Sequence, residues 1–153
     1  MADRQPRVVL DTNVLVSALI AQNRGWDTPP LRCLGLALRG EIQLITSPGL
    51  VAELLRALRY AKLRVPVERA HAFAGVVAAL ADPDGLVRTT GRLAVLRRDD
   101  ADNLVIETAL NGRAGWLVTG NIRHFAELWT PGAPPVFRDV RVVTPRQFID
   151  SRR

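Results

Sequence analysis

The chain has 153 residues, of which 48% are hydrophobic, and this composition favours one globular domain with a real core over a disordered chain. No apolar run approaches the roughly 18 residues that a membrane helix needs, and residues 1–4 lead into a strand-like segment without the apolar region of a signal peptide. The single Cys33 excludes an intramolecular disulfide and a zinc site built from cysteines. We therefore expect a cytoplasmic protein in which oxygen atoms hold any metal ion.

The chain is basic, with 21 Lys and Arg residues against 15 Asp and Glu residues and a formal charge of +6. Lys62 is its only lysine, and the planar fork of arginine suits phosphate groups. A basic surface around a local acidic cluster is the charge distribution expected of a nuclease. Because arginines that are merely solvated on the surface give the same net charge, the charge alone does not decide between a nucleic-acid-binding surface and an ordinary one.

Strand-like and helix-like segments alternate along the chain. Apolar, β-branched runs predict strands at residues 7–10, 42–45, 86–88, 116–119 and 141–143. Capping residues and apolar stripes predict helices at residues 11–20, 31–39, 48–60, 67–80, 100–110 and 121–128 and after Thr144-Pro145. Loops are expected at residues 23–30 and 130–135, a turn at 82–85, and a helix C-cap at Gly40. This alternation indicates the α/β class, with a mainly parallel sheet and helices on both faces in a single domain over residues 1–153.

Four separate segments place a carboxylate or an amide at or near a junction between a strand and a helix. These segments are residues 8–13, 47–53, 99–103 and 117–121. In an open α/β sheet, ligands bind outside the carboxyl ends of the strands, so such junctions can meet in one cleft. Acidic side chains gathered without lysine partners repel one another, and a hard cation usually neutralises a cluster of that kind.

Asp11 and Glu53 each have a structural interpretation beside the chemical one. Asp11 ends a strand and begins a helix, so it can be an N-cap whose loss costs about 1 kcal/mol. Thr12 and Asn13 follow it and could orient a ligating carboxylate or contact a phosphate. Glu53 can pair with Arg56 three residues on, which is worth only tenths of a kcal/mol. However, Glu53 borders the apolar face of its helix, which favours a partner that needs a carboxylate there.

Three acids, Asp99, Asp100 and Asp102, stand at the start of one predicted helix, which exceeds what capping requires. Residues two apart do not share a helix face, so Asp100 and Asp102 cannot both point inward within the helix. We expect Asp102 to face inward because apolar residues follow it at four, seven and eight positions along the chain.

The last of the four segments leads from a buried strand into Asn121, Arg123 and His124. Asn121 can be an N-cap, Arg123 can bind phosphate or be solvated, and His124 is more often a satisfied histidine than a metal ligand.

Together these segments resemble the PIN-domain family, and closely the PIN-type toxin components of bacterial toxin–antitoxin systems. The likeness spans nearly the whole chain. Its residues are 9–18, Ser47-Pro48 with Glu53-Leu54, 100–103 with Thr108-Ala109, 117–121 with residues 123–125, and residues 143–145 with Phe148.

The resemblance implies a three-layer α/β/α fold around a parallel sheet, an acidic pocket for Mg²⁺ or Mn²⁺, and endonucleolytic cleavage of RNA. It assigns Asp11, Glu53 and Asp102 as the acids of the metal site, with Asp100 as an adjacent extra acid. The family's fourth acid usually follows Thr-Gly or Thr-Asn, and Asn121 takes that position here. An amide oxygen can still ligate, but one negative charge is lost, so we expect weaker metal affinity or a single metal ion. Thr12, Asn13, Thr119 and Arg123 are candidates to orient these groups or to bind phosphate.

The toxin likeness further implies a small antitoxin protein as partner and a homodimer, with RNA as substrate. Hard-ion chemistry is consistent with this, because Mg²⁺ takes oxygen ligands, makes a bound water more acidic and neutralises charge on a phosphodiester. No His or Ser nucleophile is then required.

Other classes fit less well. A response-regulator receiver domain needs a lysine near its acidic pocket, and Lys62 lies in a loop-like stretch. A haloacid-dehalogenase-type phosphatase needs an Asp where Asn13 stands, and a nucleotide-binding fold needs a glycine-rich phosphate loop. The alternative from another class is a PIN-like module that has lost catalysis and only binds RNA or a partner, which Asn121 would favour.

Overall fold

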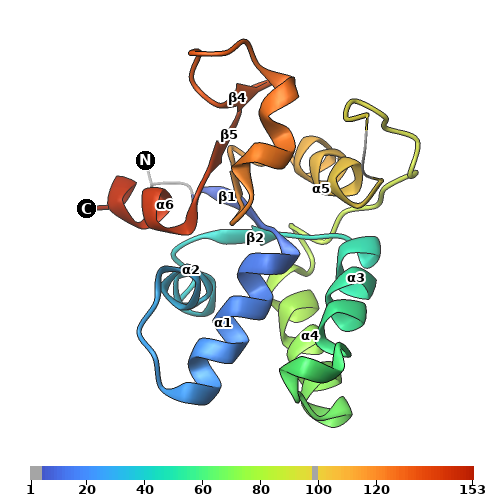
Figure 1. The fold of residues 1–153 in the computed structure, drawn as a ribbon, viewed down its shortest axis with the longest axis vertical. Coiled ribbons are helices and arrows are strands. Elements are labelled where there is room, and N and C mark those ends of the chain that lie inside the picture. Colours follow the sequence, from blue (N-terminus) through green and yellow to red (C-terminus); the bar gives the residue numbers. More distant parts are fainter. Residues whose placement is uncertain (1–4, 98–99) are drawn as a thin grey trace.

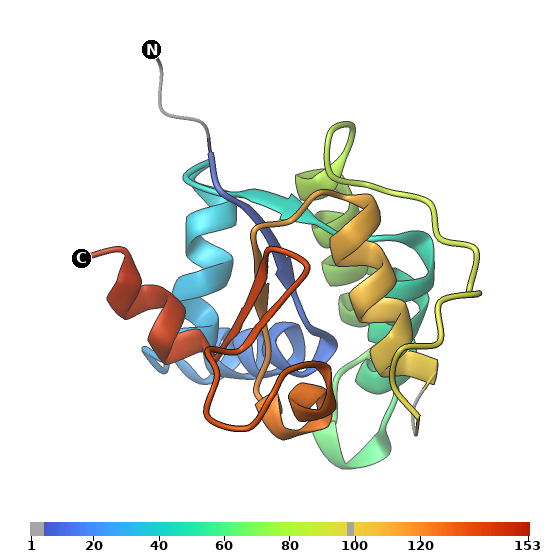
Figure 2. The same cartoon turned by 90° about the horizontal axis from the view of Figure 1, so that it is seen from above.

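The computed structural model describes residues 5–97 and 100–153. A five-stranded sheet in the order β2-β1-β3-β5-β4 runs through its middle (Figures 1 and 2). Its strands are β1 Arg7–Leu10, β2 Gln43–Ile45, β3 Trp116–Val118, β4 Val136–Phe137 and β5 Val140–Val143. The pairs β1–β2, β1–β3 and β3–β5 are parallel, and β4 adds an antiparallel edge. The predicted α/β class with a mainly parallel sheet is confirmed.

Helices lie on both faces of this sheet (Figure 2). The α-helices are α1 Thr12–Arg24, α2 Pro29–Leu38, α3 Pro48–Leu58, α4 Val67–Ala81, α5 Asp100–Asn111 and α6 Pro145–Ser151. Two 3₁₀ helices, η1 Ala61–Leu63 and η2 Ile122–Leu128, follow α3 and β3. In the described part of the chain, none of these helices is both long and apolar enough to cross a membrane.

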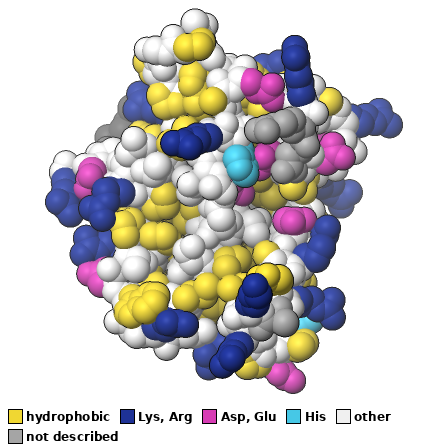
Figure 3. Space-filling view, viewed as in Figure 1, with side chains coloured by type: hydrophobic (Ala, Val, Ile, Leu, Met, Phe, Trp, Pro, Cys, Tyr) yellow, Lys and Arg dark blue, Asp and Glu magenta, His cyan; other side chains and the backbone are white. Residues whose placement is uncertain are grey.

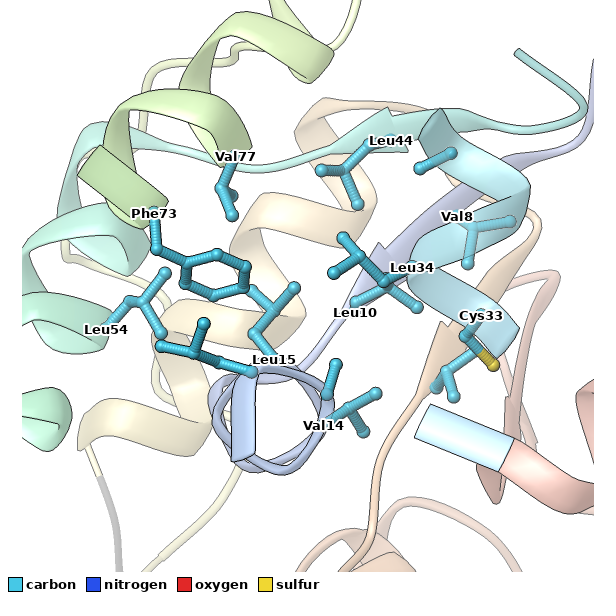
Figure 4. Close-up of a cluster of buried hydrophobic side chains, with 14 of the residues drawn as sticks. Val8, Leu10, Val14, Leu15, Cys33, Leu34, Leu44, Leu54, Phe73 and Val77 are labelled. Carbon is cyan, nitrogen blue, oxygen red and sulfur yellow. The ribbon is translucent and has the colours of Figure 1, made fainter. Parts of the chain in front are cut away.

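Alternate strand residues supply two separate cores, as the two-residue period of a β-strand requires. Val8 and Leu10 of β1 point to one face, whereas Val9 points to the other. Figure 4 shows the first core, where Val8 and Leu10 meet side chains from α1, α2, α3 and α4. The second core packs α5 and Phe125 of η2 against the opposite face. The fold is therefore the expected three-layer α/β/α arrangement.

Capping residues set the starts of the helices that follow strands. Ser47 accepts a hydrogen bond from the Leu50 N–H at 3.3 Å, with Pro48 at the first helical position. Thr144 forms a capping box with Gln147 at the start of α6. Both starts were predicted from Ser-Pro and Thr-Pro pairs.

Several predicted boundaries are wrong by a few residues. The loop predicted at 23–30 is shorter, because α1 continues to Arg24 and Thr28 caps a helix that begins at Pro29. The helix predicted to reach Tyr60 ends at Leu58. The C-cap of α2 is Arg39, and Gly40 follows it with a positive φ of 73°. The helix predicted after Asn121 is a 3₁₀ helix.

The strand predicted at residues 86–88 is also wrong. Leu86 makes only an isolated parallel bridge with Thr46, through hydrogen bonds of 2.9 Å on either side. Beyond it, the backbone of residues 90–96 is held by side chains of α5 instead of a neighbouring strand. Conversely, β4 was not predicted, since its two residues pair only with β5 next to them in sequence.

Candidate active site

Asp11 lies where β1 ends and α1 begins, and only 6% of it is exposed. Its carboxylate accepts a hydrogen bond from the Thr12 N–H at 2.8 Å, so it does cap α1. It also accepts a bond from the Thr119 hydroxyl at 2.8 Å and a long one from the Asn13 amide at 3.4 Å. A simple cap needs only the first of these contacts. The other two fix the orientation of the carboxylate at the carboxyl ends of the strands.

Residues that follow β3 complete this corner of the site. Asn13 accepts a hydrogen bond from the Gly120 N–H at 2.9 Å, which joins the start of α1 to the segment after β3. The Thr119 hydroxyl, besides donating to Asp11, accepts from the Asn121 N–H at 3.1 Å. Asn121 stands at the N-cap position of η2, yet its side chain makes no capping hydrogen bond. Its amide is therefore not committed to capping the helix.

Glu53 lies in the second turn of α3 and pairs with Arg56, as the spacing predicted. The distance between Glu53 Oε2 and Arg56 Nη2 is 3.2 Å, and 71% of the Arg56 side chain is exposed. An ion pair this exposed is worth about 0–1 kcal/mol. Arg56 can therefore leave Glu53 at little cost when another cation approaches.

Asp102 points inward from the first turn of α5, and its side chain is 15% exposed. Its Oδ2 lies 3.3 Å from Nδ1 of His124. Asp100, the first residue of α5, is exposed. Asp99 lies outside the described residues. The helical argument for Asp102 over Asp100 as the inward acid agrees with this placement, whereas the contact with His124 was not foreseen.

A cavity of about 680 Å³ opens among these residues. The polar side chains that line it include Asp11, Asn13, Glu53, Asp102, Asn121 and His124. Thr12 lines it as well, Thr119 lies buried behind Asp11, and Asp100 and Arg123 are exposed side chains that do not line it. Figure 3 shows acidic side chains and a histidine above a band of hydrophobic ones, with basic side chains below. The cavity thus joins the start of α1, helices α3 and α5, and the segment after β3, which are far apart in sequence.

A family model for the PIN domain matches residues 7–123 of the 153 residues, which is more than half of the chain. The chain belongs to the PIN-domain family. No curated protein and no solved structure matches it significantly. Membership gives this chain a nuclease-type fold, and the cavity lies at the carboxyl ends of the parallel strands β1 and β3, where such folds bind ligands.

The donor atoms of this PIN domain suit a hard divalent cation, because Asp11, Glu53 and Asp102 offer carboxylate oxygens and Asn121 offers an amide oxygen. Within residues 5–97 and 100–153, however, no three His, Cys, Asp or Glu side chains are grouped as the ligands of one ion. Glu53 and Asp102 instead contact Arg56 and His124. The chemistry of the donor set fits the metal, and side-chain rotations would have to bring the oxygens together.

Two buried polar residues on α5, to which the sequence pattern assigned no role of their own, hold the preceding loop. Asn103 accepts from the N–H groups of Val95 and Leu96 at 3.0 and 2.8 Å. Glu107, 6% exposed, accepts from the Thr90 and Gly91 N–H groups at 2.6 and 3.0 Å. Burial alone would raise the pKa of Glu107, but these hydrogen bonds outweigh it and leave the pKa below its ordinary value. These two residues fix the segment that leads into Asp102.

Proposed function

We propose that this PIN domain is a Mg²⁺- or Mn²⁺-dependent endoribonuclease that hydrolyses RNA phosphodiester bonds and acts as the toxin of a toxin–antitoxin pair. The observation that supports it best is that Asp11, Glu53 and Asp102, from three separate elements, line one cavity at the carboxyl ends of parallel strands. Nothing in helix capping or surface pairing requires three acids to share a cavity.

In this proposal, Asp11, Glu53 and Asp102 hold the divalent cation, with Asn121 as an amide donor and Asp100 at the margin. When bound, the cation supplies charge neutralisation at the phosphate and an acidified water. Thr119 keeps the Asp11 carboxylate directed into the cavity through its hydroxyl. Asn13 keeps the segment after β3 in place through the Gly120 N–H. When the cation binds, Glu53 releases its exposed partner Arg56 and Asp102 releases its exposed partner His124.

The charge of the chain supports RNA as the substrate. With a formal charge of +6, the surface around an acidic cavity attracts a polyanion and releases its counterions. Arg123, exposed in the segment just after Asn121, is well placed in sequence to meet a phosphate near the site. A small antitoxin partner and a homodimer belong to the same proposal and rest on the likeness to PIN-type toxins.

The test is RNA cleavage by the purified protein with Mg²⁺ or Mn²⁺, beside an EDTA control and the Asp11→Asn variant. Asp150→Asn is the matched control, because Asp150 is an exposed carboxylate on α6 that does not line the cavity. We expect cleavage that needs both the metal and Asp11 and is unaffected in the control. Expression in growing cells should arrest growth for the wild type but not for Asp11→Asn, if the toxin assignment is correct.

A second candidate is a PIN module that binds RNA or a protein without cutting it. Asn121 in place of an acid favours it, as does the lack of a grouped metal-ligand set among the described residues. If no RNA is cut, or if Asp11→Asn cuts as well as the wild type, this candidate replaces the nuclease.

A further inference from the structure

The cavity has an apolar end that the metal chemistry does not use. Ala57 of α3 and Val16 of α1 line it, and Tyr60 and Leu63 extend it beyond the end of α3. Glu53, Ala57 and Tyr60 are spaced by four and three residues, so they lie along one face of the helix and the turn that continues it. This face runs away from the acids at the starts of α1 and α5.

Tyr60 stands out in this wall because its ring is largely uncovered. It is 58% exposed although it lines the cavity. Its backbone position is defined by the bonds from the Tyr60 N–H to the Ala57 carbonyl at 3.2 Å and from the Leu63 N–H to the Tyr60 carbonyl at 3.0 Å. Tyr60 follows Glu53 by seven residues, which corresponds to about 10 Å along a helix axis. The ring therefore lies within the reach of a nucleotide strand whose phosphate is at the acids.

Exposed cations flank this aromatic residue in the sequence. Arg56, Arg59, Lys62 and Arg64 fall within residues 56–64, and all four are exposed. Only Arg56 is paired with an acid in the described residues of this segment, namely Glu53. Proteins that bind single-stranded nucleic acids combine cations along the backbone with aromatic rings on which bases stack.

Building on the function proposed above, we infer that the apolar end of the cavity is a subsite for an unpaired nucleobase of the RNA. The base stacks on Tyr60 and contacts the apolar wall of Val16 and Ala57, while Arg59 and Lys62 hold the neighbouring phosphates. A base in a duplex has both faces covered and cannot enter. The subsite therefore restricts the enzyme to single-stranded segments, loops and ends.

An apolar side chain of a protein partner is the other occupant that this hollow could take. The local charge favours the nucleobase, because four cations within nine residues attract a polyanion rather than a neutral or basic segment. The aromatic ring among those cations is the second reason, since stacking accepts any base.

The test measures binding before cleavage. Fluorescence anisotropy with EDTA compares a labelled single-stranded RNA with the same RNA paired to its complement, at one low salt concentration. The variants are Tyr60→Ala, the conservative Tyr60→Phe, and Trp26→Ala as the matched control. Trp26 is also an exposed aromatic residue, at 51%, and it contacts Arg24 at the far end of α1.

We expect Tyr60→Ala to bind the single strand about tenfold more weakly, with duplex binding unchanged and with Tyr60→Phe and Trp26→Ala close to wild type. In cleavage assays, Tyr60→Ala should raise KM about tenfold and leave kcat within a few-fold. Equal binding of single strands by Tyr60→Ala and wild type would overturn the inference and leave the hollow to a protein partner.

This test is separable from that of the nuclease. If the wild type cuts RNA and needs Asp11, but Tyr60→Ala is unaffected in binding and KM, only the subsite is wrong. If no RNA is cut but single-strand binding needs Tyr60, the nuclease proposal fails and the base subsite stands.

Discussion

Two of the carboxylates on helix α5, Asp102 and Glu107, are five residues apart and have opposite surroundings. Asp102 in the first turn faces the cavity, and the His124 side chain that it contacts is 47% exposed. Glu107 is buried, and its oxygens accept bonds from the backbone of Thr90 and Gly91. The comparison teaches that burial and charge do not define a site. On this helix, the acid whose oxygens are bound by backbone groups of the fold is structural, whereas the acid paired with an exposed side chain can exchange that partner for a ligand.

The largest expected effect is the loss of cleavage in Asp102→Asn. Removing one charge from the acids of the cavity weakens the hold on the cation, and we expect the cleavage rate to fall at least about a hundredfold. The free energy of unfolding should change by less than about 1 kcal/mol, because Asn has the shape of Asp and the His124 side chain that Asp102 contacts is 47% exposed. Cleavage rates and urea unfolding measure both quantities. A variant that cuts normally but unfolds easily would place Asp102 with Glu107 as a structural acid.

Thr119→Val tests whether a fully buried hydroxyl supports the site. Thr119 is 0% exposed and donates to Asp11 at 2.8 Å, so valine fills the same space but leaves the carboxylate without this donor. We expect cleavage to fall about tenfold, as for other groups that orient a metal ligand. Thr119→Ser keeps the hydroxyl and should retain most of the activity. If Ser and Val behave alike in the cleavage assay, the hydroxyl does not position Asp11.

Much of the fold and of the candidate site could be predicted from the sequence, because the signals for it are local patterns. The apolar runs before Asp11 and Asn121 predicted the strands that bring them to one edge. The helical spacing from Asp102 to Ile106 and Ala109 predicted that Asp102 points inward. Ser47-Pro48 predicted the helix start that sets the position of Glu53. Each of these signals acts within about ten residues, so no tertiary information was needed.

The rest depends on contacts between distant segments. The segment at residues 86–88 has strand-like composition, but Asn103 and Glu107 bind the backbone that follows it, and no local pattern shows this. The pairing of His124 with Asp102 joins two elements that are adjacent only in the fold. The position of Tyr60 at the cavity depends on where α3 ends, and the sequence placed that end two residues late.

Glu107→Gln should lower stability without changing the chemistry. Hydrogen bonds to a charged acceptor are worth roughly 1.5–3 kcal/mol, and the neutral amide accepts through one oxygen only. We expect a loss of about 2 kcal/mol in the free energy of unfolding, from urea titrations, while cleavage by the folded protein stays within a few-fold of wild type. Glu68→Gln on the exposed surface of α4 is the control and should leave both unchanged. Inactivity of folded Glu107→Gln would contradict the division between the two acids.

The pH dependence of stability should also trace to Glu107. The pKa of Glu107 in the folded protein lies below the ordinary value of 4.5. Near that pH, the folded protein therefore binds fewer protons than the unfolded chain does. The stability that this carboxylate contributes is fully present above the unfolded pKa and is lost as the pH falls through the folded pKa. Urea midpoints measured from pH 6 to about pH 3 should therefore fall more steeply for the wild type than for Glu107→Gln. Parallel curves would show that other acids carry the dependence.

The smallest effect, and the one that sharpens the comparison furthest, is expected from Asn121→Asp. The amide stands where the sequence resemblance implies a fourth acid, and its side chain is not used to cap η2. A carboxylate there adds one charge to the cavity beside Asp11 and Asp102. With a cation bound, this charge is neutralised and strengthens binding. Without one, the carboxylates repel and the fold loses stability. We expect the Mg²⁺ concentration for half-maximal cleavage to fall a few-fold, and the metal-free protein to unfold at slightly lower urea.

Asn121→Ala separates the added charge from the lost amide, since it should raise the Mg²⁺ requirement. If Asn121→Asp raises that requirement as well, position 121 acts through its amide and is not a weakened acid, and Asp11, Glu53 and Asp102 supply the negative charge that holds the cation.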